Sequence, residues 1–486
     1  MDIPEAQDMS EDHQPKRVIP NSRMARVEGF GRNLSADGYV FRPYHISDIK
    51  EVFQMAREAG LQVTLRGAGR SYGDANIGSE CIILDICRMN QIYSFNRKTG
   101  EIDCGAGVTI EQLWRTGIED GWWPPVVSGT MHPTLGGALA MNIHGKNAFA
   151  AGTLGEHVIE IDVFCPNGDI RTFTPTSPLF SSVISSAGLL GVITRVKLQM
   201  KRITSGDIRV LPISCQNWEE QFAAFEEYRE SADYMVAWID TFGRGESAGR
   251  GLFHAGFYTE EPPHTPTLLP QHQDLPDTIL GFFPKSIVWR FLKKLNNRFC
   301  MRILNWAKHV SGRLLGNGRP HLQSLVGFSF LLDYVPNWRR AYEPYGFIQY
   351  QSFVPEESAR QVFIQMVEMQ QERKLESFLA VMKRHRSDGF LFSHGVDGYS
   401  LALDFKLTKK NRSAIWQLAH DMNDLVNKAG GRFYLAKDST LRSDDFVQSI
   451  GKESLAQFFR AKRELDPENL LTSHLAKRIG LDTPGG

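Results

Sequence analysis

The chain has 486 residues, which is long enough for two or three domains with buried cores. Hydrophobic residues make up 42% of it and charged residues 23%, the composition of an ordinary globular protein. Lysine plus arginine and aspartate plus glutamate both number 55, so no overall field favours nucleic acid as a partner. Any function that depends on charge must therefore be local.

The termini and the cysteines indicate the compartment. Six scattered cysteines show no C-x-x-C motif and no metal-like spacing, which predicts reduced structural thiols and no metal site. The N-terminal stretch is polar and lacks the basic start and apolar run of a secretory signal. Residues 322–332, the longest apolar candidate, fall short of the roughly 20 apolar residues that a spanning helix requires. We expect a cytoplasmic protein whose residues 1–19 form a disordered tail.

The first part of the chain alternates between strand and helix patterns. Ser47 is a plausible N-cap for a helix over 48–59, which has apolar residues at helical spacing and ends at Gly60. Thr109 and Gln112 form a capping-box pair that opens a helix to about residue 119. Strands are predicted at 39–42, 61–65, 81–86, 158–165, 170–173 and 192–199, with Asn167-Gly168 as a hairpin turn and a short helix near 179–185.

The pattern changes after about residue 205. Longer helices over 218–231 and 357–373 flank strands at 235–240 and 399–406, which indicates a second domain. Residues 432–486 return to short motifs, with a strand at 433–436 and a helix at 455–465. The chain is therefore predicted to be α+β, with a first domain at 20–204, a second inserted at 205–431, and a C-terminal segment at 432–486 that rejoins the first.

A glycine-rich run directly after an apolar strand is the strongest local motif: Arg-Gly-Ala-Gly-Arg-Ser-Tyr-Gly-Asp at 66–74. Glycines let consecutive backbone N–H groups converge on a phosphate without interference from Cβ atoms. Arg66 and Arg70 would add charge-assisted hydrogen bonds. The G-x-G-x-x-x-G spacing, followed by a strand instead of a long helix, does not fit a Rossmann fold. The run indicates a phosphate cradle of another fold, with a purely structural turn as the alternative.

A second glycine-rich region supports the cradle interpretation. Ser-Gly-Thr at 128–130 and Thr-Leu-Gly-Gly-Ala at 134–138 lead into Asn-Ile-His-Gly-Lys-Asn at 142–147, which suggests a backbone site for a pyrophosphate. His144 in this setting is either a site residue or a structural histidine. Residues 188–193, Gly-Leu-Leu-Gly-Val-Ile, form a third close-approach turn before a strand.

Three segments together resemble a known family. Arg-Gly-x-Gly-Arg-Ser-Tyr-Gly-Asp, Gly-Gly-Ala-x-Ala-x-x-Ile-His-Gly-Lys-Asn and Tyr-Leu-Ala-Lys-Asp-Ser at 434–439 resemble the decaprenylphosphoryl-β-D-ribose 2′-oxidases. That family belongs to the vanillyl-alcohol-oxidase group of FAD proteins, which also includes the sugar-lactone oxidases. The resemblance runs from about residue 20 to the C-terminus and is weakest across 245–325. It implies a two-domain PCMH-type FAD-binding fold with an inserted α+β substrate (cap) domain.

The resemblance also implies site residues. Those implied to bind FAD are Arg66, Gly67, Ala68, Gly69, Arg70, Ser71, Tyr72, Gly73, Gly129, Thr130, Gly136, Gly137, Ala138, Ile143, His144, Gly191, Ile193 and Tyr434. Those implied to line the substrate pocket are Gln349, Gln351, Lys383, Ala402 and Lys437. Many relatives attach FAD covalently through a histidine where this chain has Arg70, so FAD is expected to be held non-covalently. Ala402 replaces a cysteine of many actinobacterial relatives, so the shape of the pocket is expected to differ.

Lys437 and His144 are the expected catalytic residues. In the oxidation of a secondary alcohol, a hydride leaves carbon for the flavin while a nearby base accepts the hydroxyl proton. Lys437 is implied to lie beside the substrate hydroxyl, and it acts as the base only if burial or a neighbouring cation lowers its pKa. Otherwise Lys437 orients the hydroxyl or stabilises the reduced flavin. The sequence leaves both roles open.

Residues 278–332 form a basic and aromatic segment. They include nine lysines and arginines, many aromatic and aliphatic residues, and no aspartate or glutamate. Such a segment suits docking on an anionic membrane surface. The alternative is an ordinary helix with one buried face and one solvated basic face. A lipid-linked phosphosugar substrate would fit the membrane interpretation, because it must be collected from a bilayer.

These observations lead to an expected function. The chain is expected to oxidise the ribose 2′-hydroxyl of a polyprenylphosphoryl sugar, the first half of an epimerisation that a separate reductase completes. It is expected to be cytoplasmic and peripheral at the inner membrane face, without nucleic acid as a partner. A soluble sugar or aldonolactone oxidase would use the same flavin site without the basic segment. A catalytically silent, membrane-associated flavoprotein is the second alternative, and intact Lys437 and His144 argue against it.

Overall fold

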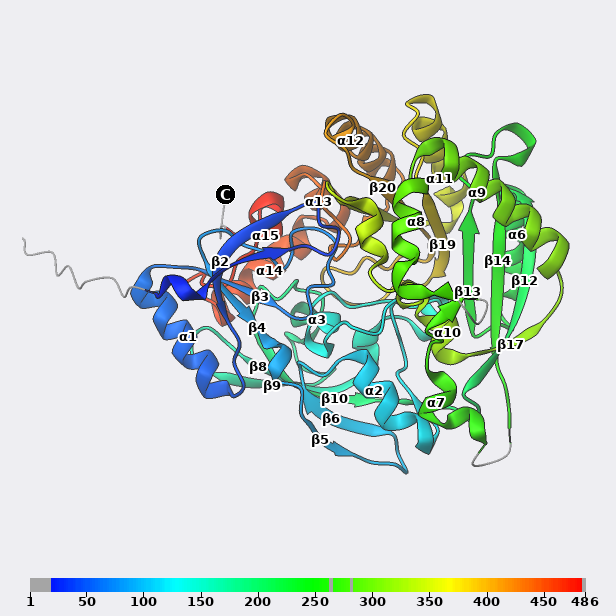
Figure 1. Cartoon of the computed structure of the whole chain (residues 1–486). Coiled ribbons are helices and arrows are strands. Elements are labelled where there is room, and N and C mark those ends of the chain that lie inside the picture. The colour runs from blue at the N-terminus through cyan, green and yellow to red at the C-terminus, as the bar shows by residue number, and fades with distance from the viewer. Residues whose placement is uncertain (1–18, 262–264, 280–282, 483–486) are drawn as a thin grey trace, which may run out of the picture.

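The computed structural model describes residues 19–261, 265–279 and 283–482. The expected N-terminal tail lies outside this part except for Ile19, which is buried in the core. Residues 280–282 of the basic segment also lie outside it. Within the described ranges, no helix is both long enough and apolar enough to cross a membrane. The described strands form one large sheet, two smaller sheets and two two-stranded ribbons (Figure 1).

The first small sheet has the strand order β1-β2-β4-β3. Its strands are β1 (Met24–Glu28), β2 (Ser35–Phe41), β3 (Val63–Arg66) and β4 (Ile82–Asp85). Helix α1 (Ile46–Ala59) connects β2 to β3 and ends at Gly60 in the left-handed region, as predicted. The predicted N-cap was wrong: His45 caps α1, because the Asp48 carboxylate accepts hydrogen bonds from the backbone N–H groups of Tyr44 and His45.

The second small sheet is antiparallel, in the order β5-β6-β10-β8-β9. Its strands are β5 (Ile92–Phe95), β6 (Glu101–Gly105), β8 (Val158–Phe164), β9 (Ile170–Phe173) and β10 (Val192–Gln199). The predicted hairpin at Asn167-Gly168 joins β8 to β9. Helix α2 (Ile110–Gly117) begins at the predicted Thr109–Gln112 capping box. The short helix α3 (Leu135–Ala140) packs against β10.

The large sheet has eight strands in the order β17-β12-β14-β13-β19-β20-β18-β21. They are β12 (Asp207–Asn217), β13 (Tyr234–Ile239), β14 (Gly249–Tyr258), β17 (His321–Ser324), β18 (Phe347–Pro355), β19 (Leu379–His385), β20 (Gly398–Lys406) and β21 (Arg432–Phe433). Helices α6 (Trp218–Tyr228), α11 (Glu356–Glu372) and α12 (Arg412–Lys428) pack on this sheet. Residues at every second position project from the sheet into a cavity that the glycine-rich loops close.

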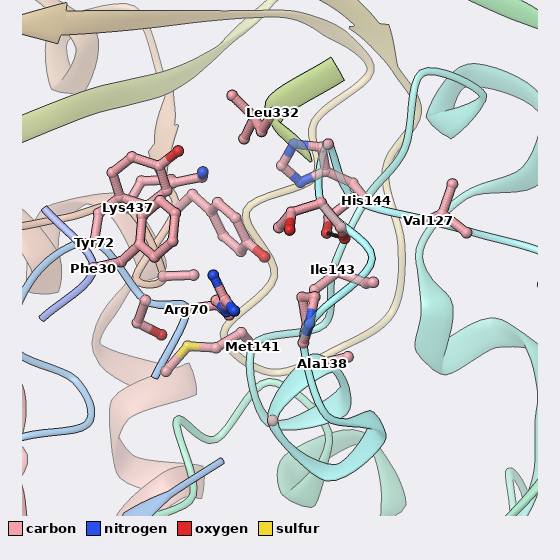
Figure 2. Close-up of a pocket in the computed structure, with 18 of the residues that line it drawn as sticks. Phe30, Arg70, Tyr72, Val127, Ala138, Met141, Ile143, His144, Leu332 and Lys437 are labelled. Carbon is pink, nitrogen blue, oxygen red and sulfur yellow. Dashed lines mark hydrogen bonds between the residues drawn. The ribbon is translucent and has the colours of Figure 1, made fainter. Parts of the chain in front are cut away.

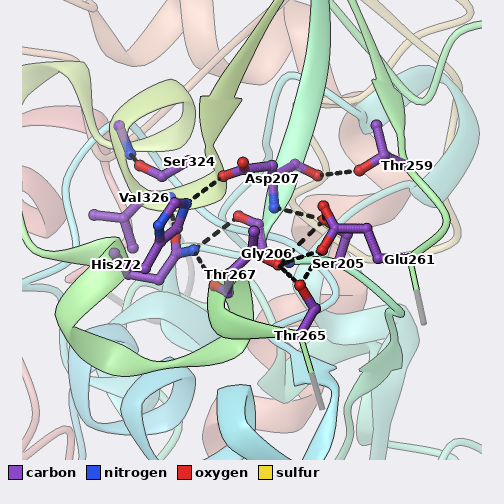
Figure 3. Close-up of polar contacts among 12 residues, drawn as sticks. Ser205, Gly206, Asp207, Thr259, Glu261, Thr265, Thr267, His272, Ser324 and Val326 are labelled. Carbon is purple, nitrogen blue, oxygen red and sulfur yellow. Dashed lines mark hydrogen bonds and ion pairs between the residues drawn. The ribbon is translucent and has the colours of Figure 1, made fainter. Parts of the chain in front are cut away.

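A polar network marks the point where the chain enters the large sheet (Figure 3). Ser205 Oγ donates to Glu261 Oε1 at 2.9 Å, and the N–H of Gly206 donates to Thr267 Oγ1 at 3.1 Å. The Asp207 carboxylate lies 2.7 Å from His272 Nε2. These contacts join the start of β12 to a segment more than fifty positions later in the chain.

The C-terminal segment returns from the large sheet to the small ones. β21 pairs with β18, after which the N–H of Tyr72 donates to the Ala436 carbonyl at 2.7 Å. The predicted strand at 433–436 is therefore shorter, because residues after Phe433 leave the sheet to meet the glycine-rich loop. Helices α13 (Ser443–Ile450), α14 (Lys452–Leu465) and α15 (His474–Ile479) follow. The chain enters the large sheet at β12 and leaves it after β21, close to the proposed domain boundaries at 204/205 and 431/432. The division into these domains stays a proposal.

Candidate active site

A cavity of about 580 Å³ lies between the large sheet and the glycine-rich loops. Its size is within the range of roughly 300–1,000 Å³ that is typical of ligand and cofactor sites. All residues predicted to bind FAD or substrate line this cavity except Gly73. Gly73 packs against the later chain instead, since a Cβ atom there would lie 1.8 Å from the Asp438 carbonyl oxygen.

The first glycine-rich loop presents unused hydrogen-bond donors to the cavity. Among the described residues, no acceptor is found for the backbone N–H groups of 68–71. The buried Nε of Arg70 is also without a partner, and Figure 2 shows the Arg70 side chain among the lining residues. Arg66 has a different role: its guanidinium donates to the Asn76 side chain at 2.8 Å and to the Glu28 carbonyl at 3.1 Å. Arg66 thus shapes the loop, and Arg70 remains available to an anion.

The two glycine-rich loops touch each other. Thr134 caps α3 by accepting a hydrogen bond from the N–H of Gly137 at 3.3 Å. A Cβ atom on Gly67 would lie 2.2 Å from Thr134 Oγ1, so this position has room only for glycine. The loop that carries Gly129 is joined to the large-sheet side, because Gly129 accepts from the N–H of Leu332 at 3.1 Å.

The cavity fits FAD on these observations. Free N–H groups and Arg70 would hold the pyrophosphate, since buried donors without acceptors are costly unless a ligand satisfies them. Apolar side chains that would contact the ring systems line the same cavity, among them Ile86, Val127, Ile143 and Ile193. No residue that lines the cavity in the described part of the chain is an aspartate or a glutamate. The nearby carboxylate of Asp333 accepts a hydrogen bond from Thr130 Oγ1 at 2.8 Å.

His144 is held as a neutral side chain. Its Nδ1 lies 2.9 Å from His394 Nε2, and Gln351 Nε2 donates to its Nε2 at 3.1 Å. Burial lowers the pKa of His144 well below its ordinary value, and the cation of Lys383 lowers it further. Because Nε2 accepts from Gln351, Nδ1 carries the proton and donates to His394. His144 therefore positions Gln351 and presents no charge to the site.

Lys437 lies at the opposite side of the view from His144 (Figure 2). Its Nζ is 3.6 Å from the centre of the Tyr72 ring. Burial lowers the pKa of Lys437 to about 7, Asp404 opposes that shift, and Lys383 adds to it. A buried lysine beside another cation is the condition under which an amine can accept a proton near neutral pH.

Asp404 is a site residue that the sequence reasoning missed. It is 1% exposed and faces Gln349 across β18 and β20, where Gln349 Nε2 donates to its Oδ1. Its Oδ2 is buried without a partner. Burial raises the pKa of Asp404 to about 6, and Gln349 and Lys437 limit the rise. The only sequence signal was its place two positions after Ala402 on the same strand face.

Sequence reasoning also missed a cluster of cations at the end of the cavity that lies next to the large sheet. Lys308 Nζ lies 4.2 Å from the Trp238 ring centre, and Lys146 Nζ lies 4.1 Å from the Phe328 ring centre. Burial lowers the pKa of Lys146 to about 7. The surroundings of the Lys308 amine lower its pKa to about 8 by desolvation, although the residue as a whole is exposed. His254 lines the same cavity as both lysines. Burial lowers the pKa of His254 to about 4, and the charges of Lys146 and Lys308 lower it further. Lys308 and His254 fall in the region where the resemblance was weakest.

Comparisons with known proteins agree with this geometry. Residues 38–174 match the model of an FAD binding domain. The chain is 29% identical over 448 residues to decaprenylphosphoryl-beta-D-ribose oxidase of Mycolicibacterium smegmatis, covering 89% of this chain and 92% of that protein. A putative D-arabinono-1,4-lactone oxidase of Neurospora crassa is 28% identical over 157 residues, 32% of this chain and 28% of that protein. Cytokinin dehydrogenase 2 of Arabidopsis thaliana is 29% identical over 166 residues, 33% of either chain.

The expected resemblance and the expected cofactor are thereby confirmed. The match to the FAD binding domain covers both glycine-rich loops that the motifs singled out. The similarity to the oxidase covers 89% of this chain, so it extends well beyond the FAD binding domain. The roles of individual residues and the non-covalent attachment of FAD stay predictions.

Proposed function

We propose that this FAD-dependent oxidoreductase, which acts on CH–OH groups, oxidises the ribose 2′-hydroxyl of a polyprenylphosphoryl sugar. The relative from Mycolicibacterium smegmatis is named for a substrate of this class, and it is similar along most of this chain. The product would be a 2′-keto sugar, and its reduction from the opposite face by a separate reductase would complete an epimerisation.

The observation that carries the proposal is the charge of the cavity. Four lysines line it, namely Lys146, Lys308, Lys383 and Lys437, and no carboxylate does so within the described residues. Their lowered pKa values show that charge is costly there without a counterion. A substrate phosphate would remove that cost, whereas a neutral sugar or an aldonolactone would not. The chemistry of the cavity therefore favours a phosphorylated sugar.

The chain's own residues would move the proton. Bound FAD supplies the two-electron acceptor for the hydride of the carbinol carbon. Neutral Lys437 would accept the hydroxyl proton at Nζ as the C–H bond breaks, leaving a ketone and an ammonium group. Gln349, which is fixed by Asp404, and Gln351, which is fixed by His144, would hold the sugar hydroxyls. Lys146 and Lys308 would hold the phosphate at the large-sheet end of the cavity.

Anaerobic flavin bleaching tests the substrate class. A water-soluble short-chain prenylphosphoryl ribose should bleach the flavin, with a KM about tenfold or more below that of free ribose or an arabinonolactone, because one charge-assisted hydrogen bond contributes about 1.5–3 kcal/mol. Lys308→Gln should raise the KM for the phosphosugar and leave the KM for ribose unchanged. Lys294→Gln, at an exposed position outside the cavity lining, is the matched control. Equal bleaching by neutral sugars would favour a soluble sugar oxidase, and no bleaching by any substrate would favour a silent flavoprotein.

The attachment of the cofactor is tested separately. Arg70 stands where many relatives have the linking histidine, so acid precipitation should release the flavin into the supernatant. Absorbance of the supernatant and the pellet in the visible flavin band measures this directly. Yellow colour that remains with the pellet would contradict non-covalent binding.

A further inference from the structure

An apolar surface faces outward on two helices of the basic segment, α8 (Val288–Leu295) and α9 (Arg298–Ser311), and on the adjoining turn η8 (Gly312–Gly316). These elements run along the outside of the molecule (Figure 1). We call this the α8–α9 surface. Its exposed members are Phe291, Leu295, Phe299, Ile303, Leu304, Trp306, Leu314 and Leu315. Phe299 is 73% exposed and Leu315 72% exposed, which leaves most of both side chains in water.

The amphipathic pattern of α9 is inverted with respect to a helix that packs on a core. Its two buried side chains are polar: Asn305 donates to Asp240 at 3.4 Å, and His309 lies 3.2 Å from the Cys215 carbonyl oxygen. Phe299, Ile303 and Trp306, at helical spacing, point away from the protein. A surface helix in water normally buries its apolar stripe and exposes its polar one. The outward stripe of α9 therefore indicates a second apolar phase or a partner outside the protein.

The same surface carries cations without protein partners. Arg290, Lys294, Arg302 and Arg313 are exposed, and no carboxylate of the described chain lies within ion-pair distance of them. By contrast, Lys293 pairs with Glu343 at 3.2 Å, and Arg298 pairs with Glu376 at 2.5 Å. Because residues 278–332 contain no aspartate or glutamate, this segment itself contributes only positive charge to the α8–α9 surface.

We propose that the α8–α9 surface docks on an anionic lipid bilayer. Exposed aromatic and aliphatic side chains flanked by unpaired lysine and arginine are suited to an interface in which headgroups are negative and acyl chains begin just below. A two-fold contact between copies of this chain would instead place cations against cations. The charge of the surface therefore favours lipid over self-association.

Docking would bring the active-site cavity to the bilayer. Helix α9 contributes Lys308 to the cavity lining, two positions after the exposed Trp306. Leu331 also lines the cavity and is 56% exposed. A lipid-linked substrate could thus pass from the membrane to the cavity along the edge of one helix. The docking itself does not depend on the proposed substrate.

Co-sedimentation of the FAD-loaded full chain with vesicles tests the proposal without any substrate. The protein should bind vesicles that contain phosphatidylglycerol, should bind pure phosphatidylcholine at least tenfold more weakly, and should dissociate as salt is raised, since surface attraction is screened within about 8 Å at physiological ionic strength. Lys294→Glu/Arg302→Glu/Arg313→Glu should lower binding at least tenfold, and so should Phe299→Ser/Trp306→Ser/Leu315→Ser. Lys293 and Arg298 are avoided because their ion pairs serve the fold.

Matched controls separate this surface from general charge and apolarity. Lys409→Glu/Lys410→Glu/Lys452→Glu changes net charge equally at exposed positions elsewhere, and Tyr93→Ser/Ile170→Ser removes exposed apolar side chains elsewhere. Both should bind vesicles like the unmodified chain. All variants should bleach flavin normally with the short-chain soluble substrate, so loss of docking and loss of activity are distinguishable. The proposal is overturned if the unmodified chain ignores anionic vesicles, if either surface variant binds as well as it does, or if the surface variants change only the oligomeric state.

Discussion

At the scale of residues, the reactivity of the site rests on Lys437 and its neighbours. Burial and Lys383 lower the pKa of Lys437, and the carboxylate of Asp404 limits the fall. The amine is therefore poised between its charged and neutral forms near neutral pH. Tyr72, whose hydroxyl is buried without a partner, lies under it. The site thus combines a proton acceptor, in a cavity lined by cations, with a buried carboxylate, Asp404, that does not itself line the cavity.

Replacing Lys437 separates the two roles that the sequence left open. Lys437→Met should keep its flavin but reduce it more slowly, by roughly 10²–10⁴-fold, the usual effect of removing a positioned proton-transfer group. Lys437→Arg keeps the positive charge but cannot accept a proton near neutral pH. If Lys437 is the base, both variants should be slow; if its charge only orients the hydroxyl, the arginine variant should recover most of the rate. Stopped-flow measurement of flavin reduction makes the comparison, with flavin content as the check on folding.

The pH dependence of flavin reduction has a predicted sign. A base must be neutral, so the rate at saturating substrate should rise as pH rises through the pKa of Lys437, about 7. The charge of Asp404 raises that pKa, so Asp404→Asn should move the rising limb to lower pH while keeping the hydrogen bond from Gln349. A rate that falls with pH over this range would show that the protonated amine is the active form.

Phosphate binding should depend on pH in the opposite direction. Lys146 and Lys308, which are proposed to hold the phosphate, bind an anion in their protonated forms, and their pKa values are lowered to about 7 and about 8. The KM for the phosphosugar should therefore rise as pH increases above about 7. The KM for ribose should stay level over the same range, and a parallel rise for both substrates would exclude phosphate binding as the cause.

At the scale of elements, two glycine-rich loops pack together into one wall of the cavity. They can approach each other because Gly67 has no side chain, and a Cβ atom there would collide with Thr134. Gly67→Ala should displace Thr134 from the start of α3 and lower the flavin-to-protein ratio of the purified chain. Gly389→Ala is the matched control, since its Cβ atom would meet nothing within 4 Å and its backbone is not left-handed. Full flavin content in Gly67→Ala would show that the loop contact is not needed for binding.

Helix α9 shows how an element can serve two surfaces. Its polar residues fix it to the large sheet, Lys308 reaches the cavity, and its apolar residues face outward. Buried hydrogen bonds of Asn305 and His309 anchor the helix, and such bonds stabilise even where little apolar area is removed from solvent. A membrane would supply the missing apolar burial.

At the scale of the whole molecule, a buried lysine joins the C-terminal segment to the first part of the chain. Lys462 on α14 donates to the Leu189 carbonyl at 2.9 Å, to the Leu471 carbonyl at 2.7 Å and to Asp466 at 2.6 Å. Both charged side chains are at most 1% exposed. Because Leu189 lies in a turn whose glycines line the cavity, this contact also fixes the wall of the active site.

Lys462→Met should leave the buried Asp466 carboxylate without its cation, with only the backbone N–H groups of Leu470 and Leu471 as partners. The free energy of unfolding should fall by about 3–5 kcal/mol, as expected when one partner of a buried pair is removed. Lys462→Met/Asp466→Leu should regain part of the loss, because no charge is then left buried. Lys452→Met, at the exposed start of the same helix, should change stability by less than about 0.5 kcal/mol. Chemical denaturation of the unmodified chain and the three variants measures these differences in stability. Equal denaturation midpoints would contradict a structural role for the Lys462–Asp466 pair.

The sequence by itself determined the local structure and the cofactor site. Helix boundaries at Gly60 and Thr109, the Asn167-Gly168 turn and the glycine-rich loops follow from backbone preferences of a few adjacent residues. Such preferences act locally, so they can be recognised without knowledge of the fold. The motifs also carried the family resemblance, which is why the residues predicted to bind FAD meet at one cavity, with Gly73 as the exception.

Only the tertiary structure decided how distant residues combine. Asp404 meets Gln349 because the register of β18 and β20 places them opposite each other, and register depends on the whole sheet. Lys308 and His254 join Lys146 through packing that no local pattern encodes. The sequence showed that the basic segment has one apolar and one basic face, but not which face meets the protein. That choice depends on what packs against the helix, and in α9 the buried side chains are the polar ones.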